Sequence, residues 1–441
     1  MTERGGILTI AFGIAALALA AWAAGHGRAI ATTPVTPIQA DLPGVLVPHA
    51  TPAPIGTNGF WIAGWVGPPP ALRDAAAWRA HAAAGLDVSM GPLEDRYRRA
   101  DNLARLAFLD SLRAADGDST VPFVFVRDDS LHPDEATRPG WERRVEAIVR
   151  AYAGSRSLAG YFLADEPRLA DSAGWAPTAR LLRRLDPAHP AYVNFLPIRQ
   201  EDAARPEARA GWSNAIARTL ATGRLGLFTF DAYPFPVGGG ERPHFLATLR
   251  AAADLSRSGA IPFGVVLQWT GHGQLRSATR AEALYQATQA LVHGAAGITW
   301  FTWWTPNPAE EPWRWRDGAI AYDGTRTARA DTLAAVNRRV RAIAAARGPG
   351  PMRAVHVGGG LPHGLDPSFE VGSRLPPEAP VTRVIGGPAT LGWTLSTHSA
   401  SAPTKCVLAN RDRANARAFT VTMRDGTTRS FTIPPGDAVV F

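Results

Sequence analysis

Eight times along this chain of 441 residues, a short apolar run rich in β-forming residues is followed by a longer segment rich in Ala, Leu and Arg. The runs start about 27 to 38 residues apart, which is the length of one strand plus one helix. They cover Gly59–Val66, Leu86–Gly91, Val121–Val126, Ala159–Leu163, Ala191–Phe195, Leu227–Phe230, Pro262–Leu267 and Ile298–Trp303.

The segments between the runs have the periodicity of amphipathic helices. Asp101–Ala115 places its leucines along one broad face, and Thr279 is a suitable N-cap for a helix that extends to His293. Strands that alternate with helices pair in parallel. An open doubly wound sheet is the alternative, but the chain has no glycine-rich nucleotide motif after its first strand. The sequence therefore predicts a closed (β/α)8 TIM barrel over residues 55–347.

The pattern changes after Gly348, where the run Gly348–Pro351 ends the last helical segment. Short β-like runs separated by turn residues follow, a pattern typical of antiparallel strands. They are Met352–Val357, Lys405–Asn410, Ala418–Met423, Ser430–Ile433 and Ala438–Phe441. We expect a small C-terminal antiparallel β-sandwich over residues 348–441.

The first residues indicate export. Arg4 precedes an apolar run from Ile7 to Ala24, and Ala21-Trp22-Ala23 offers a small-x-small cleavage signal. We interpret residues 1–24 as a signal peptide, or as an uncleaved membrane tether because the run approaches the length of a bilayer span. Residues 25–54, rich in Pro, Thr and Ala, resemble a linker. The remainder would be periplasmic, secreted or anchored facing outward.

Charge and cysteine content exclude several functional classes. The net charge is +8, but the basic residues are almost all scattered arginines without a like-charged run. This is typical of a solvated helical surface, and we expect no nucleic-acid partner. Cys406 is the only cysteine, so an intrachain disulfide and a cysteine-based zinc site are excluded.

Polar residues follow the predicted strands, at the barrel end where active sites lie. Carboxylates, amides and tryptophans suit a sugar, because they pair with hydroxyls and stack on pyranose faces. Histidines are scarce there, which disfavours a histidine metal site; we expect neither metal nor organic cofactor. The candidates are Glu94, Asp95, Asp128, Asp129, Asp165, Glu166, Asn194, Asp231, Tyr233, Gln268, Trp269, Trp303 and Trp304.

Glu166 is the best candidate for a proton donor. It follows the apolar run Tyr161-Phe162-Leu163 and precedes Pro167, so partial burial would raise its pKa toward neutrality. The alternative is that Asp165 and Glu166 cap the following helix. Two adjacent carboxylates at a barrel mouth favour catalysis.

Several aromatic residues could line the same mouth. Tyr233 would hydrogen-bond a substrate hydroxyl or a catalytic carboxylate, although wall packing is an equal alternative. Trp269, Trp303 and Trp304 are either sugar contacts or core residues, and at most one of the adjacent pair would face the cavity. The loop Asn307–Arg316 adds two glutamates and two tryptophans as a rim.

The segments Gly160–Pro167, Asp231–Phe235 and Gly294–Pro306 carry a family resemblance. The chain resembles the clan A glycoside hydrolases, the superfamily that includes the β-galactosidases, over about residues 55 to 441. It is also similar to bacterial glycoside-hydrolase-like proteins with a barrel and a C-terminal β-domain. The resemblance implies a (β/α)8 fold and an acid/base glutamate at the end of strand four, which Glu166 matches.

The chain departs from the pattern of that clan at two positions. Asp165 stands where an asparagine usually precedes the acid, and Gln268 stands where strand seven carries the nucleophile. Three alternatives follow: Asp231 is the second carboxylate, which we favour; Asp128 or Asp129 activates water; or Asp165 and Glu166 act together on an N-acetyl sugar, as a resemblance to acetamido-assisted hexosaminidases suggests.

The sequence thus predicts an exported glycoside hydrolase that acts on an oligo- or polysaccharide. Glu166 and Asp231 would be catalytic. Asp165, Asp128, Asn194, Tyr233, Gln268, Trp269, Trp303 and Trp304 would bind the sugar. Two alternatives stay open: a non-catalytic carbohydrate-binding protein on a decayed barrel, which Gln268 supports, and a hydrolase using a metal held by Asp and Glu.

Overall fold

A computed structural model of the chain describes residues 59–69, 74–91, 98–117, 120–131, 138–168, 172–259, 261–348, 350–359, 375–395 and 404–441, together with positions 136, 361 and 365. The predicted signal peptide or tether (1–24) and linker (25–54) lie outside the described residues, as do Glu94 and Asp95. Within the described part, no helix is both long and apolar enough to cross a membrane.

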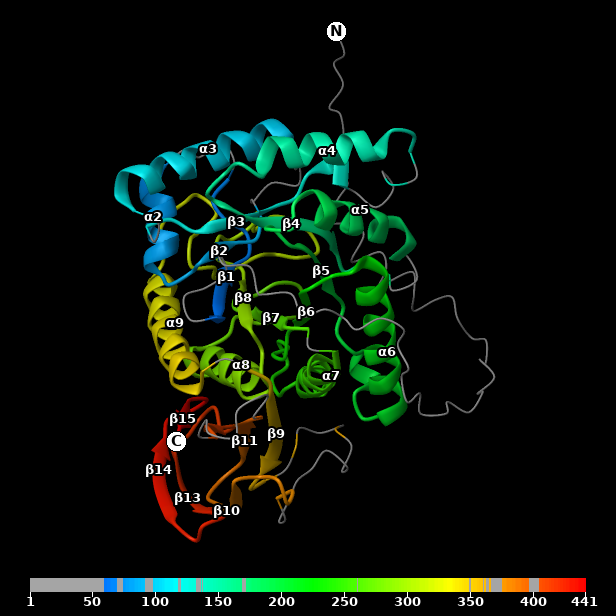
Figure 1. The fold of residues 1–441 in the computed structure, drawn as a ribbon. Helices are drawn as coiled ribbons and strands as arrows, with labels where there is room; N and C mark the ends of the chain where they lie inside the picture. The colour runs from blue at the N-terminus through cyan, green and yellow to red at the C-terminus, as the bar shows by residue number, and fades with distance from the viewer. Residues whose placement is uncertain are drawn as a thin grey trace.

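Eight parallel strands close into a barrel in sequence order, β1 to β8, with β1 paired to β8 (Figure 1). Each strand contains or overlaps one of the eight predicted apolar runs. The strands are β1 (Trp61–Gly64), β2 (Val88–Ser89), β3 (Phe123–Val126), β4 (Leu158–Asp165), β5 (Ala191–Phe195), β6 (Phe228–Ala232), β7 (Phe263–Gln268) and β8 (Gly297–Phe301).

Helices cover the outside of the barrel and follow the strands in turn (Figure 1). They are α2 (Ala75–Ala83), α3 (Arg99–Asp116), α4 (Trp141–Tyr152), α5 (Ser172–Leu185), α6 (Pro206–Gly223), α7 (His244–Gly259), α8 (Arg280–Val292) and α9 (Ala328–Arg347), with the short 3-10 turns η2 (Asp129–Leu131) and η5 (Gln200–Asp202). Thr279 caps α8 as predicted, through a reciprocal capping box with Glu282.

Successive side chains on a barrel strand point alternately outward, toward the helices, and inward, so the strands contribute to two separate apolar cores. On β5, Val193 and Phe195 pack outward against the helices, whereas Tyr192 belongs to the cluster inside the barrel. The floor of that interior is filled by Trp61, the first residue of β1. A Cβ atom on Gly297 would lie 2.1 Å from its indole ring, and one on Gly264 would lie 2.4 Å away. Glycine at these two positions therefore makes room for the indole.

The C-terminal unit consists of two antiparallel sheets, ordered β10-β13-β14 and β15-β12-β11-β9. Their strands are β9 (Met352–Val357), β10 (Val381–Ile385), β11 (Ala389–Thr394), β12 (Cys406–Asn410), β13 (Arg417–Met423), β14 (Thr428–Ile433) and β15 (Ala438–Val440). A shared apolar core that includes Cys406 lies between the sheets. The closed barrel followed by these sheets confirms the predicted fold class.

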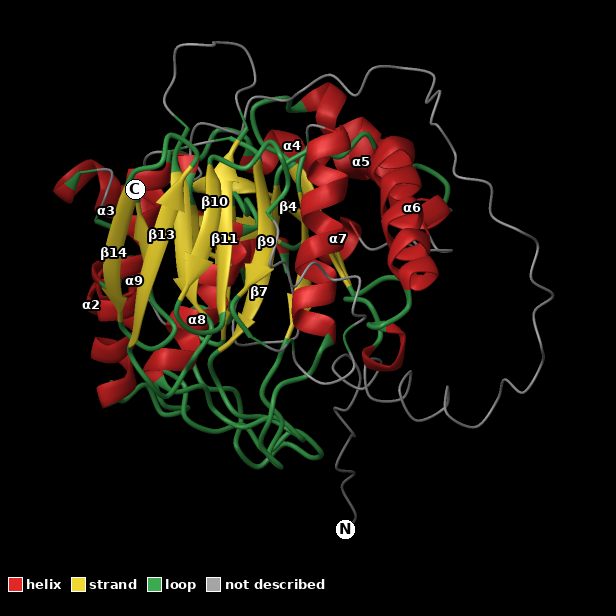
Figure 2. Ribbon diagram, turned by 90° about the horizontal axis from the view of Figure 1, so that it is seen from below, coloured by secondary structure: helices red, strands yellow, loops and turns green. Residues whose placement is uncertain are grey.

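The C-terminal unit packs against the barrel helices α7, α8 and α9 (Figures 1 and 2). The sequence did not predict β10 or β11. On β11, Gly392 interrupts the apolar pattern, and the contact explains the glycine: a Cβ there would lie 2.6 Å from a methyl of Val292. A side chain at that position would push α8 away from the sheet.

Candidate active site

The ends of β4, β5 and β6 bring three carboxyl groups and one amide together. β4 ends at Asp165, and the next residue, Glu166, has a left-handed backbone with φ 47°. Its amide donates to the carbonyl of Asn194 on β5 at 2.8 Å. A left-handed conformation is unfavourable for a residue with a Cβ atom, and such strain concentrates at functional sites. Glu166 is therefore a candidate on backbone grounds as well.

Asn194 connects the two aspartates. Its side-chain nitrogen donates to Asp165 Oδ1 at 3.0 Å and also to Asp231 Oδ1 on β6. Its side-chain oxygen accepts from the Thr229 hydroxyl at 2.7 Å. Asn194 is fully buried, so it positions the carboxyls from beneath. The structure thus brings the predicted residue into the site but gives it no surface for direct sugar contact.

Burial raises the pKa of each of the three carboxyls, and the charge of one neighbour in the group raises each pKa further. Burial raises the pKa of Asp231 well above its usual range, and the charge of Glu166 and a hydrogen bond with Glu166 add to this. Burial also raises the pKa of Glu166; the hydrogen bond with Asp231 lowers it, and the charge of Asp165 raises it. Carboxyls this close cannot all ionise readily. The group therefore retains a proton near neutral pH.

Asp165 is the member of this group that solvent reaches most readily, whereas Asp231 is only 7 % exposed and Glu166 is intermediate. Surrounding protein nevertheless raises the pKa of Asp165 to about 6, with the charge of Asp231 as the second cause; Arg127 and Asn194 oppose the shift. Asp165 is thus the carboxyl of the three that is open to solvent at the end of β4. Asp165, Glu166 and Asp231 are called the acidic cluster below.

Aromatic rings form a wall beside the acidic cluster. Tyr233 stacks on Phe301 at 5.5 Å between ring centroids, and Trp65 meets the edge of Phe301 at 6.0 Å. His272 stacks on Trp315 at 4.9 Å and also contacts Phe301. Burial and the nearby carboxylates raise the pKa of Tyr233, which stays a phenol. Both tryptophans in the predicted rim loop belong to the wall, because Trp313 stacks on Trp315 at 5.9 Å and also contacts His272.

Sequence reasoning missed Trp65 and Phe301. A signal for Phe301 was present, because it shares the face of β8 with Gly297 and Thr299, whereas Ile298 and Trp300 pack outward. Trp65 directly follows β1, where no polar residue marks the strand end.

The tryptophans predicted as sugar contacts lie elsewhere. Trp269, Trp303 and Trp304 are all under 5 % exposed and pack in the core between barrel and helices. Arg329 lies 3.8 Å from the Trp269 ring centroid, and Trp303 meets His81. The expectation that Trp303 and Trp304 point to opposite sides assumed that β8 continues through them, but β8 ends at Phe301.

Gln268 does end β7, but it is fully buried and its amide bonds to main-chain groups. The side-chain nitrogen donates to the carbonyl of Phe235 at 2.9 Å and to that of Arg276, while the side-chain oxygen accepts from the Phe235 amide at 2.8 Å. Gln268 therefore holds together the loops that follow β6 and β7, and its amide is not available to a ligand.

Asp128 is likewise set apart from the acidic cluster. It is 3 % exposed, accepts from the Tyr152 hydroxyl at 2.6 Å and pairs with Arg99 at 3.5 Å. Asp129 is exposed on η2.

Of the predicted site residues, the structure thus unites Asp165, Glu166, Asn194, Asp231 and Tyr233 at one end of the barrel. Among the described residues, no three His, Cys, Asp or Glu side chains are placed to hold a metal ion together.

The fold and the site define a (β/α)8 barrel with an acidic cluster and an aromatic wall at the carboxyl ends of its strands. Searches with protein-family models and among curated proteins find no match.

Solved structures of barrel enzymes are similar at low identity. The β-galactosidase from Rahnella sp. R3 is 12 % identical with a TM-score of 0.46, covering 65 % of this chain and 56 % of its own. The glucosidase from Croceicoccus marinus is 13 % identical with a TM-score of 0.43, covering 87 % and 82 %. The catalytic core of xylanase A is 11 % identical with a TM-score of 0.41, covering 63 % and 98 %. This chain spans less than two thirds of the β-galactosidases that it matches. The fold class rests on the strand order of the chain itself.

Proposed function

We propose that this chain is a glycoside hydrolase that cleaves O-glycosidic bonds of an oligo- or polysaccharide by general acid catalysis. The observation that carries the proposal is the acidic cluster, in which burial first and then the charge of a neighbouring carboxyl raise the pKa of Asp165, Glu166 and Asp231. A carboxyl that keeps its proton near neutral pH can protonate the leaving oxygen of a glycosidic bond. The aromatic wall suits the apolar faces of a sugar ring.

In this proposal the three carboxyls have different roles. Glu166 is the proton donor, and Asp231 shares its proton before the reaction. An acid and a nucleophile that act on one sugar lie about 5 to 5.5 Å apart, and inverting pairs lie farther apart. Hydrogen-bonded carboxyls are closer than either, so we assign Asp231 to proton holding and the exposed Asp165 to the anomeric centre. This revises the sequence-based hypothesis that Asp231 is the second carboxylate.

The test is a glycosidase assay of the wild-type chain and of the variant Glu166→Gln, with aryl glycosides, N-acetylated glycosides and polysaccharide fragments. We expect turnover by the wild type and a loss of kcat by a factor of about 10² to 10⁴ in the variant. The loss should be smallest for aryl glycosides with acidic leaving groups, which need little proton donation. Unchanged turnover in the variant would remove Glu166 from the mechanism.

Export belongs to the same proposal and is supported by the apolar run Ile7–Ala24 alone. Expression of the full chain in a bacterial host, followed by fractionation and N-terminal sequencing, tests it. We expect the protein outside the cytoplasm; recovery only from the cytoplasm, with residues 1–24 intact, would contradict export.

One observation favours a second function, carbohydrate binding without turnover. β7 contributes no carboxylate, and the Gln268 amide at its end bonds to main-chain groups. Micromolar binding of a glycan that the chain does not cleave, unaffected by Glu166→Gln, would support this function over hydrolysis.

A further inference from the structure

The loop that follows β6 carries Tyr233 into the mouth and is held at both ends by side chains from other parts of the molecule. Its first anchor is Phe235, which is fully buried. Gln268 bonds both main-chain groups of Phe235, as described above. Two guanidinium groups lie over the Phe235 ring: that of Arg276 at 5.1 Å from the ring centroid and that of Arg413, from the C-terminal unit, at 5.0 Å.

The second anchor is Glu241, near the other end of the loop. Arg413 pairs with Glu241 Oε2 at 3.2 Å, and the Tyr285 hydroxyl of α8 donates to Glu241 Oε1 at 2.5 Å. Burial raises the pKa of Glu241; Arg413, Tyr285 and Arg411 lower it, and Glu282 raises it slightly. Arg413 also lies 5.4 Å from the Tyr285 ring centroid. One arginine thus contacts both anchors of the loop.

Arg413 lies on a rigid arm, the segment between β12 and β13. Asp412 Oδ1 accepts the amides of Ala414 and Asn415, both at 2.9 Å, and Asp412 also bonds Arg417. The amide of Gly436 donates to the Asp412 carbonyl at 3.0 Å. These bonds fix the backbone on either side of Arg413 to the C-terminal unit.

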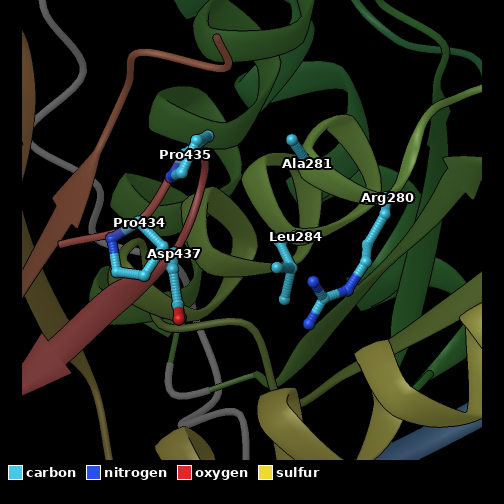
Figure 3. Close-up of a pocket in the computed structure, with 6 residues that line it drawn as sticks. All are labelled: Arg280, Ala281, Leu284, Pro434, Pro435 and Asp437. Carbon is cyan, nitrogen blue, oxygen red and sulfur yellow. The ribbon is translucent and has the colours of Figure 1, made fainter. Parts of the chain in front are cut away.

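The same region of the C-terminal unit lies directly on α8. A Cβ atom on Gly436 would be 2.1 Å from the carbonyl oxygen of Ala281, which leaves no gap between them. Beside this contact Pro434, Pro435 and Asp437 face Arg280 and Leu284 across a small pocket of about 270 Å³ (Figure 3). The arm is therefore braced against the barrel helix that also carries Tyr285.

We propose that Arg413 is a positioning residue for the barrel site: it locks the loop of residues 233–243 and thereby sets the place of Tyr233 and Asp231 in the acidic cluster. The inference rests on the proposed function for its kinetic consequence. Asp231 and Tyr233 lie two to four residues before Phe235, so a displaced anchor moves them directly. A displacement of about 1 Å in an active site lowers the rate by up to about 10²-fold.

The experiment compares Arg413→Met, which removes the charge, with the conservative Arg413→Lys. The matched control is Arg339→Met, because Arg339 makes another ion pair between the barrel and the C-terminal unit, with Asp437 at 2.9 Å, without contacting the loop. We expect Arg413→Met to lower kcat about 10- to 100-fold with KM within about threefold, and Arg413→Lys to keep part of the wild-type kcat. Arg339→Met should lower thermal stability but leave kcat unchanged.

Amide hydrogen exchange of residues 233–243 provides a readout that needs no turnover. The amide of Phe235 donates to Gln268 Oε1, that of Val237 to the Gln274 carbonyl and that of Arg242 to the Pro234 carbonyl. Arg413→Met should speed their exchange at least about tenfold, whereas Arg339→Met should not. Equal exchange and equal kcat in the two variants would overturn the positioning role. If the wild type cleaves no glycoside, the proposed function fails, and faster exchange confined to Arg413→Met still supports the lock.

Discussion

The two sides of the barrel mouth differ in what their polar side chains bind. On the side of β4 to β6, Asp165, Asn194 and Asp231 bond to one another. On the side of β7, Gln268 ends its strand in an equivalent position, yet its amide bonds to main-chain groups of two loops. Polar residues at strand ends are therefore not equivalent: those that contact each other form a site, and those that contact the backbone hold loops together.

Removal of one cluster member is expected to have the largest effect. Asp231→Asn cannot hold a proton for Glu166, and we expect kcat to fall by a factor of about 10² to 10³. The matched control is Asp128→Asn, because Asp128 is also buried but bonds to Tyr152. It should lower the free energy of unfolding by about 1 kcal/mol and leave kcat within twofold. Similar kcat values for the two variants would contradict a catalytic role that is specific to the acidic cluster.

A carboxylate at position 268 tests whether the β7 side of the barrel mouth can take part in catalysis. Gln268→Glu cannot donate to the carbonyls of Phe235 and Arg276, and it would bury a charge beside them. We expect the free energy of unfolding in urea to fall by about 2–4 kcal/mol, with no gain in turnover. Gln200→Glu, at an exposed position, should stay within about 0.5 kcal/mol. A gain in kcat from Gln268→Glu would show that this side can serve as a catalytic position.

The aromatic wall and the buried tryptophans provide a smaller contrast. Phe301→Leu removes a ring that stacks on Tyr233, and we expect KM to rise about three- to tenfold with kcat little changed. Trp303→Phe alters only the core behind the wall, so it should lower the melting temperature and leave KM within twofold. A larger rise in KM from Trp303→Phe than from Phe301→Leu would contradict sugar binding at the aromatic wall.

The smallest expected effect is a pH dependence of stability. The pKa of Asp165 is raised from 3.8 to about 6 in the folded chain, so the fold binds this proton more tightly than the unfolded chain does. The stabilisation of the folded chain by this proton is fully present below pH 4 and is lost as the pH rises through 6. Asp165→Asn should therefore raise the melting temperature more at pH 7.5 than at pH 4, by roughly 1–3 °C, since solvent screens an exposed carboxyl. An equal difference at both pH values, measured by calorimetry, would contradict the raised pKa.

The sequence predicted the barrel because a strand–helix period repeated eight times has few other solutions, and every predicted run coincides with a barrel strand. It also predicted that Asp165, Glu166, Asn194, Asp231 and Tyr233 meet. It did not distinguish Gln268 or Asp128 from them, because the bonds that engage those side chains come from Phe235 and Tyr152, distant in sequence. Trp303 and Trp304 were misplaced because the end of β8 depends on tertiary contacts, which periodicity does not report, and Trp269 lies beyond the end of β7 in the core.

Trp61 has a consequence for the passage of a substrate. Because its indole lies against Gly264 and Gly297 and packs with the other buried side chains inside the barrel, no open channel runs along the barrel axis. An oligo- or polysaccharide of the proposed kind could not pass through the barrel and would have to bind at the end where the acidic cluster lies. If the chain is a glycoside hydrolase as proposed, the released fragment and the next substrate must pass through the same opening, at the carboxyl ends of the strands.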